Sequence, residues 1–372
     1  MGALDGIKVL DLSRVLAGPW ATQLLADLGA DVVKVESPKG DGTRGWGPPY
    51  IDGDAAYYHA CNRGKRSMIV DLKSEEGMAI LHKLIQASDV VVENFKTGTL
   101  ERFGVVPEMF EGKILCRITG YGQTGPRASE PGYDLALQAM AGIMSVTGPA
   151  DGEPVKVGVA WIDVLTGMMA GNGILAALFH RERTGEGQTI DLSLYDVALM
   201  AMVNQAQNWI ASGADPQPMG HAHPNIVPYQ AFPASDEWFI LACGSDLQFA
   251  NVCKATGATT LQRDALTENS GRMAARVEII NTLSTIFKTH SAAHWISELN
   301  RVGVPCVPIQ SISQAFTDLQ AESRNALWHL GDQVSVANAL RFMSKTPAVP
   351  SLPPPKLGEH TQQILSDWLG DE

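Results

Sequence analysis

Residues 154–180 hold one acidic side chain, Asp163, in an otherwise apolar and glycine-rich run. Val155, Val157 and Val159 alternate ahead of it, which predicts an extended approach, and apolar side chains between 165 and 178 recur at helical spacing. Asp163 is therefore expected at or just before the start of a helix. A carboxylate there can cap the helix by accepting its first free backbone N–H groups. It can also act as a nucleophile toward a reactive carbonyl group.

A second group of reactive side chains is the NRGKRS turn at 62–67, which places three cations in six residues ahead of a predicted strand. It is not a Walker phosphate-binding loop, because His59 stands where that motif requires an earlier glycine. Two interpretations stay open. The turn is either an ordinary solvated turn or a site where Lys65 and Arg66 hold the phosphates of a nucleotide-like ligand.

The composition is that of a globular protein large enough for two domains, with 372 residues, 45% hydrophobic and 18% charged. A formal net charge of -12 argues against non-specific nucleic-acid binding, although local Arg and Lys side chains can still form an anion site. The five cysteines form no CxxC pair, and His221 and His223 have no third ligand nearby in sequence, so no metal site is expected. We recognise no signal peptide and no apolar run of membrane-spanning length, so a cytoplasmic protein without membrane contact is expected.

Predicted strands alternate with helices through about residue 200, which is typical of a doubly wound parallel sheet. The strands are expected at 7–12, 31–36, 68–72, 89–92, 113–118 and 189–194. Ligands of such sheets bind where the strands reach their carboxyl ends. After a loop rich in Pro and His at 216–233, a strand at 237–242 and further helices predict a smaller α+β domain.

Several blocks of the sequence are informative when they are taken in order. They are GIKVLDLSRVLAGPWATQLLADLGADVVKVE, NRGKRS, VVENFKTGTLERFG, ITGYGQTGP, the segment around Asp163 and RTGEGQTIDLSLYD, with GEHT near the C-terminus. Together they resemble the blocks of class III coenzyme A transferases. That family includes formyl-CoA and carnitine-CoA transferases, and the alpha-methylacyl-CoA racemases share its fold. The resemblance covers nearly the whole chain and is strongest over residues 5–200.

The resemblance implies an α/β protein with a Rossmann-like, doubly wound parallel sheet in a large domain, a smaller α+β domain, and a homodimer of interlocked, ring-like subunits. The large domain would begin with residues 1–200 and connect through a linker at 201–225 to a small domain at 226–325. Residues 326–372 would return and complete the large domain. No cofactor would be bound permanently, because a coenzyme A thioester is itself a substrate, beside small carboxylic acids.

The resemblance also assigns roles to individual residues, with Asp163 as the nucleophile. The positions that match the family's CoA-binding channel are Val15, Leu16, Ala17, Ser37, Cys61, Asn62, Arg63, Gly64, Lys65, Asn94, Phe95, Lys96, Arg102, Ile118, Thr119, Gly120 and Tyr121. Ser37 replaces an arginine of formyl-CoA transferase. The acyl pocket is expected to include Arg44, Tyr133, Asp134 and His223. Arg44, in the loop at 40–50, would pair with the distal carboxylate of a dicarboxylic acid, and a second loop at 221–229 would add to the selectivity.

The implied chemistry is covalent. Asp163 would attack the thioester carbonyl to give a mixed anhydride and CoA thiolate, and the thiolate would convert the anhydride into an aspartyl-CoA thioester. The acceptor carboxylate would then run the two steps backwards. Backbone amides near Gly18 or at the start of the Asp163 helix would stabilise the developing oxyanions.

The same residues allow other interpretations. A racemase needs two acid/base groups, and its histidine corresponds here to Tyr133, which is a poor base near neutral pH. The neighbouring Asp134 is better interpreted as a helix cap. Retention of Asp163 argues against a noncatalytic CoA-binding homologue. A dehydrogenase is disfavoured, because the residues after the first strand are SRVLAG rather than GxGxxG.

Overall fold

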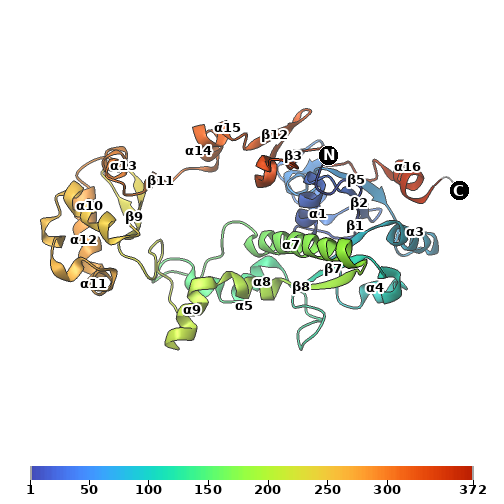
Figure 1. Cartoon of the computed structure of the whole chain (residues 1–372), viewed down its shortest axis with the longest axis horizontal. Coiled ribbons are helices and arrows are strands. Elements are labelled where there is room, and N and C mark those ends of the chain that lie inside the picture. The colour runs from blue at the N-terminus through green and yellow to red at the C-terminus, as the bar shows by residue number, and fades with distance from the viewer. Residues whose placement is uncertain (1, 371–372) are drawn as a thin grey trace. The chain divides into compact units, whose positions relative to one another are not determined.

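The computed structural model describes residues 2–370, which form two compact units (Figure 1). The large unit comprises the described residues up to Ile143, then Lys156–Ala214, and those from Leu319 onward. The small unit comprises Met144–Val155 and Asp215–Asp318. The predicted linker at 201–225 therefore contains residues of both units, and the segment Met144–Val155 was not expected in the small one.

A six-stranded parallel sheet organises the large unit. Its strand order is β5-β2-β1-β6-β7-β8, which is the order of a Rossmann sheet. The strands are β1 (Lys8–Asp11), β2 (Asp31–Glu36), β5 (Lys65–Ile69), β6 (Val90–Glu93), β7 (Ile114–Thr119) and β8 (Gln188–Ser193). The chain builds outward from β1 to β5 and then returns to the other side of β1 at β6. This reversal creates the crevice in which sheets of this kind bind ligands.

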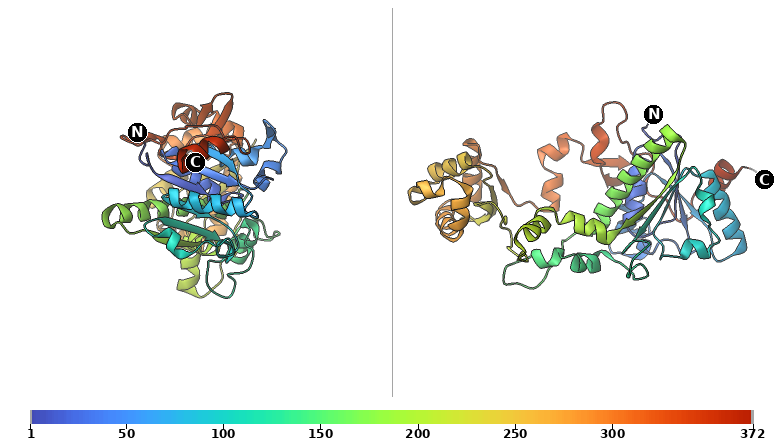
Figure 2. Two further views of the ribbon diagram at one scale, coloured as in Figure 1. Left: turned by 90° about the vertical axis from the view of Figure 1, so that its right-hand side faces the viewer. Right: turned by 60° about the horizontal axis from the view of Figure 1, so that its bottom comes forward.

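Successive side chains of each strand enter different cores, because neighbouring residues in a strand face opposite sides of the sheet. In β1, Val9 packs with α1 (Ala17–Asp27) and α7 (Trp161–Thr184), whereas Leu10 packs with α3 (Glu75–Ala87). Figure 2 shows α7 along one face of the sheet and α3 beyond the other. The C-terminal turns α16 (Thr361–Ile364) and Leu365–Leu369 add Ile364 and Trp368 to the α3 side.

Helix α7 is long and apolar enough, by length and composition alone, to cross a membrane. The expectation that no apolar run reaches that length is therefore wrong. The helix is a core element of the large unit, where Ile162, Ala170, Ile174 and Leu178 are buried against the sheet and α1.

The remaining elements are short. Those of the large unit are β3 (Tyr50–Ile51), β4 (Asp54–Ala55), α2 (Ala56–His59), α4 (Thr99–Arg102), α5 (Asp134–Met140), α8 (Leu194–Ala201), α9 (Val203–Ser212), α15 (Leu319–Ser323), β12 (Leu327–Leu330) and β13 (Gln333–Val336). A further helix, α6 (Ile143–Val146), spans the boundary between the units. The small unit has an antiparallel sheet of β9 (Tyr229–Pro233), β10 (Trp238–Ala242) and β11 (Cys306–Pro308). Its helices are α10 (Asp246–Thr256), α11 (Asn269–Ala274), α12 (Arg276–Phe287), α13 (Ala292–Arg301) and α14 (Ile312–Phe316).

Two helices of the large unit have notable ends. The helical stretch 194–212 is divided into α8 and α9, and Val203 at the break has a φ of 35°. Helix α7 continues to Thr184 and ends at Gly185, which has the left-handed conformation that commonly ends helices.

Candidate active site

A cavity of about 190 Å³ lies at the carboxyl ends of β1, β6 and β7 in the large unit. The loops that follow β1 and β6 form two of its walls, so it occupies the crevice at the point where the strand order reverses. The residues that line it are Arg14, Val15, Leu16, Ala17, Asn94, Phe95, Lys96, Thr97, Ile118, Thr119, Gly120, Ala128, Ser129, Glu130, Pro131, Gly132, Tyr133, Asp163 and Leu194.

Asp163 enters this cavity from the first turn of α7. It is the third residue of the helix, and the N-cap position is Ala160, which has no side-chain capping bond. The interpretation of Asp163 as a cap is therefore wrong. The capping acceptor is Asp134, whose Oδ1 accepts hydrogen bonds from the backbone N–H groups of Ile162 at 2.8 Å and Asp163 at 3.4 Å. The side chain of Asp163 is left free for chemistry.

The surroundings of Asp163 resist its ionisation. Burial raises the pKa of its carboxyl group to about 7, and the negative charge of Asp134 adds to the rise. The helix start favours a carboxylate, but this effect does not overcome the loss of water. Asp163 is thus a poorly hydrated carboxyl group whose pKa is raised toward neutral pH, as is common for reacting groups at active sites.

The start of α1 faces the same cavity, through Leu16 and Ala17. The first N–H groups of a helix have no intrahelical acceptor, and no side chain caps α1. Gly167 of α7 lets the two helices approach, since a Cβ atom there would lie 2.6 Å from the carbonyl oxygen of Ala17. Asp163 and the residues whose amides begin α1 therefore line the same small cavity.

Two cations lie at this cavity, Arg14 and Lys96. Both side chains are exposed, and among residues 2–370 neither has a carboxylate oxygen within 4 Å. The Arg14 guanidinium lies 5.9 Å from the centre of the Phe95 ring. These side chains can pair with an anionic ligand without first breaking an ion pair.

The structure brings together nine of the positions assigned to CoA binding, beside Asp163 and Tyr133. These are Val15, Leu16, Ala17, Asn94, Phe95, Lys96, Ile118, Thr119 and Gly120. Asn94 also has an internal role, because its side-chain amide accepts from the Arg14 N–H at 2.9 Å and donates to the Arg14 carbonyl at 2.7 Å. It therefore fixes the loop after β1.

The cations at residues 61–65, positions that match the CoA-binding channel, are held inside the fold, which argues against a phosphate site there. Lys65 is fully buried, and its ammonium group donates to Asp11 at 3.0 Å, to the Pro19 carbonyl at 2.9 Å and to Asn62 at 2.8 Å. All three of its N–H groups are used. The buried Arg63 makes a two-point ion pair with Asp27, at 2.9 and 2.7 Å.

The other residues of this turn are also buried or paired. Cys61, Asn62 and Gly64 are buried. The half-buried Arg66 pairs with Asp31 and Asp367. The segment leads into β5, to which Lys65 and Arg66 belong, and its cations are all engaged in contacts within the fold.

Arg44 is also held by contacts within the fold, and these contacts argue against its predicted role in binding the acyl group. Its guanidinium makes a two-point ion pair with Glu36, at 2.8 and 2.7 Å, and a second ion pair with Asp54 at 2.6 Å. It also donates to the Tyr58 hydroxyl at 2.6 Å. With these partners and 8% exposure, it has no free face for a substrate carboxylate.

The other predicted residues lie outside the cavity lining. Ser37 and Arg102 are exposed, and Arg102 donates to Thr99 at 2.7 Å. Tyr121 packs against Tyr195, with ring centres 5.7 Å apart. His223 belongs to the small unit, so its place in the acyl pocket stays a prediction, as does the interlocked dimer.

Sequence reasoning missed two residues. Arg14 lies between matched positions in the loop after β1, and its place at the carboxyl end of the first strand could have identified it. Tyr57 had no such signal. Burial and the nearby charge of Asp163 raise the pKa of the Tyr57 phenol to about 12. Tyr57 therefore keeps its proton near neutral pH.

The sequence matches the family model described as CoA-transferase family III over residues 4–361. The chain is 44% identical to the succinate–glutarate CoA-transferase of Agrobacterium fabrum, covering 98% of this chain and 95% of that protein. It is 36% identical to the acetyl-CoA:oxalate CoA-transferase of Acetobacter aceti, covering 100% and 97%. A crystal structure of a CaiB/BaiF family protein from Brucella suis matches with a TM-score of 0.89 and 43% identity over 99% of both chains. The chain therefore belongs to CoA-transferase family III and is an enzyme that transfers CoA between an acyl-CoA and a carboxylic acid.

Proposed function

We propose that this enzyme moves CoA from a dicarboxylic acyl-CoA such as succinyl-CoA to a free dicarboxylic acid, through covalent intermediates on Asp163. The observation that carries the proposal is the place of Asp163 in the cavity. Its carboxyl group is desolvated and free of any capping bond, and it shares the cavity with the uncapped start of α1. A carboxylate that has lost its hydration is a better nucleophile toward a thioester than one in water.

The first half-reaction has two steps. An Asp163 carboxylate oxygen attacks the thioester carbonyl carbon, the C–S bond breaks, and a mixed anhydride and CoA thiolate result. The thiolate then attacks the Asp163 side-chain carbonyl, the anhydride C–O bond breaks, and the donor acid leaves as a carboxylate. CoA is then held as a thioester on Asp163.

The second half-reaction reverses these steps with the acceptor. Its carboxylate attacks the aspartyl thioester to give a new anhydride and CoA thiolate, and the thiolate attacks the acceptor carbonyl. The new acyl-CoA leaves and the Asp163 carboxylate is restored. Each addition places negative charge on a carbonyl oxygen, and the amides of Leu16 and Ala17, two residues that line the cavity, would stabilise that charge.

Two observations support a dicarboxylic substrate. Relatives that match over nearly the whole chain are described as acting on succinate and glutarate, on oxalate and on mesaconate. The exposed and unpaired Arg14 and Lys96 can hold a second carboxylate at the cavity. Arg14 is the better candidate, because its guanidinium can make two parallel hydrogen bonds to a carboxylate.

The test is CoA transfer from succinyl-CoA, followed by chromatography of the acyl-CoA products. Glutarate and pentanoate form a matched pair of acceptors, since they have five carbons each and differ in the second carboxylate. We expect glutaryl-CoA to form at least 100 times more efficiently than pentanoyl-CoA. Equal efficiency would reject the dicarboxylic assignment, and no CoA transfer to any acid in a wider panel would reject the function.

A further inference from the structure

The loop between β1 and α1 has an unusual backbone. Val15, which lines the cavity, has a φ of 71°. Left-handed backbone is unfavourable for a β-branched residue, and such conformations persist where the surrounding structure enforces them. Because Val15 directly precedes Leu16 and Ala17, its backbone angles decide where the amides of those two residues point. Contacts with the surrounding fold must therefore keep Val15 in the left-handed conformation.

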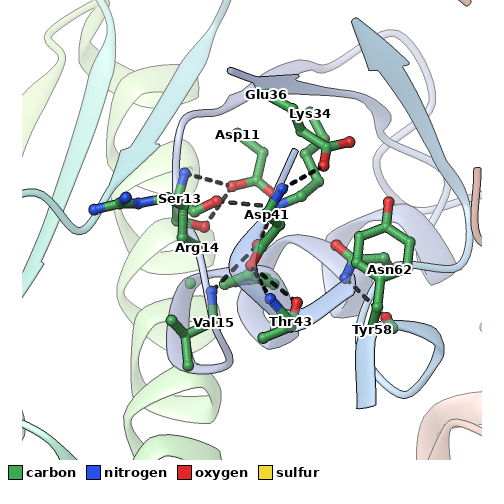
Figure 3. Close-up of polar contacts among 12 residues, drawn as sticks. Asp11, Ser13, Arg14, Val15, Lys34, Glu36, Asp41, Thr43, Tyr58 and Asn62 are labelled. Carbon is green, nitrogen blue, oxygen red and sulfur yellow. Dashed lines mark hydrogen bonds and ion pairs between the residues drawn. The ribbon is translucent and has the colours of Figure 1, made fainter. Parts of the chain in front are cut away.

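The group that holds Val15 is the buried carboxylate of Asp41. The Val15 N–H donates to Asp41 Oδ2 at 3.2 Å, and the same oxygen accepts from the Lys34 ammonium at 3.1 Å (Figure 3). Lys34 also donates to the carbonyl oxygen of Ser13 at 2.9 Å. Asp41 and Lys34 therefore bind the same loop at two backbone atoms. The side chains of both are fully buried, so water does not compete for these bonds.

Asp41 is itself fixed from the other side. Its Oδ1 accepts from the N–H and the hydroxyl of Thr43, at 3.0 and 2.9 Å, and its own N–H donates to Glu36 at 2.9 Å. The second wall of the cavity contributes Asn94, which binds the N–H and carbonyl of Arg14. The loop is thus clamped at Ser13, Arg14 and Val15, while Leu16 and Ala17 remain free to face the cavity.

We propose that Asp41 is a positioning residue of the transfer reaction. Without contacting substrate, it holds Val15 in the left-handed conformation and thereby aims the Leu16 and Ala17 amides at the carbonyl group that Asp163 attacks. The proposal rests on the function given above. It predicts that Asp41 contributes to the rate of covalent transfer and little to the affinity for CoA.

The test is a double-mutant cycle of Asp41→Asn and Val15→Gly, with single-turnover formation of the covalent enzyme as the readout. Asn keeps the shape of Asp41 but loses the charge that holds Lys34 and the Val15 N–H. In the valine background we expect the transfer rate to fall about 30-fold, while CoA affinity changes less than threefold. Glycine adopts a φ of 71° without strain, so in the glycine background the same change should cost less than fivefold. An equal loss in both backgrounds, or no loss in a folded Asp41→Asn protein, would overturn the proposal.

Two further variants keep the experiment decisive. Asp54→Asn is the matched control, because Asp54 pairs with Arg44 in the neighbouring ion-pair group and has no hydrogen bond to the loop. It should lower stability without slowing transfer. If Asp41→Asn does not fold, Lys34→Met combined with Asp41→Leu removes both charges together, which buried pairs tolerate better than the loss of one partner. The same rescue by Val15→Gly is then expected.

A measurement that does not depend on the transfer reaction separates this proposal from the function on which it rests. Hydrogen exchange at the Val15 amide should be at least tenfold faster in Asp41→Asn than in Asp54→Asn. If the enzyme formed no covalent intermediate but this difference appeared, the clamp would stand and the proposed function would fail. Covalent transfer without the exchange difference would remove the role of Asp41 and leave the function intact.

Discussion

The pKa of Asp163 gives the reaction a specific pH dependence. Burial and Asp134 raise the pKa from an ordinary 3.8 to about 7. A shift of roughly three units makes ionisation in the cavity about 4 kcal/mol more costly than in water. Because only the carboxylate attacks, kcat/KM should be near its plateau above pH 8, half of it near pH 7, and about a tenth near pH 6, where an unshifted aspartate would be fully active.

The matched perturbation is Asp134→Asn. Asn keeps an oxygen that can accept from the Ile162 N–H, but it removes the negative charge that opposes ionisation of Asp163. The pKa of Asp163 should fall, so the acid limb of kcat/KM should move to lower pH. Glu76→Gln removes an exposed charge from α3 and should leave the limb in place.

The assay is kcat/KM for succinyl-CoA between pH 5 and 9 in a constant-ionic-strength buffer. Ionisation of the substrate itself is common to all three proteins, so it cancels in the comparison. An acid limb near pH 4 in the unmodified enzyme would refute the desolvation of Asp163. A limb near pH 7 that does not move in Asp134→Asn would refute the role of the second carboxylate.

Three further outcomes are expected. Arg14→Met should raise KM for glutarate about tenfold, a loss of about 1.4 kcal/mol, and leave pentanoate unaffected; an equal change for both acids would exclude a carboxylate anchor. Gly167→Ala should lower the free energy of unfolding by about 1–3 kcal/mol in urea titrations, because the added Cβ atom would meet the Ala17 carbonyl. Asp27→Asn should lower it by about 3–5 kcal/mol by leaving Arg63 buried without its partner. The folded Asp27→Asn protein should have the same KM for acyl-CoA as the unmodified enzyme. A raised KM with unchanged stability would instead indicate that Arg63 binds the phosphates of CoA.

The sheet was predictable because its strands are encoded locally. Short apolar runs bounded by polar turns mark each strand, and the helices between them require parallel pairing. The strand predicted at 31–36 matches β2 (Asp31–Glu36) residue for residue. The strand expected at 68–72 begins earlier, at Lys65, because paired cations can occupy positions that otherwise favour apolar residues. Because Lys65 is charged, the sequence pattern placed it in the turn before the strand.

The charged residues at the site were also hard to place from sequence, because their partners lie far away along the chain. Lys65 pairs with Asp11, which lies 54 residues earlier, and Arg44 is closed by Glu36, Asp54 and a carbonyl of Pro355. A sequence shows which side chains carry charge but not which charges the fold brings together. The place of Asp163 could be predicted, because one carboxylate in a long apolar stretch is conspicuous. The hydrogen bonds that Asp134 accepts from the first turn of α7 could not, since they join positions 28 and 29 residues apart.

The central claim is that CoA passes through a covalent bond to Asp163. The most direct measurement is intact-protein mass spectrometry after mixing with succinyl-CoA, followed by hydroxylamine and peptide mapping. We predict an added mass of CoA or succinyl that hydroxylamine removes, that maps to the peptide containing Asp163, and that is absent in Asp163→Asn. Continued CoA transfer by Asp163→Asn, or an adduct on another residue, would contradict the account.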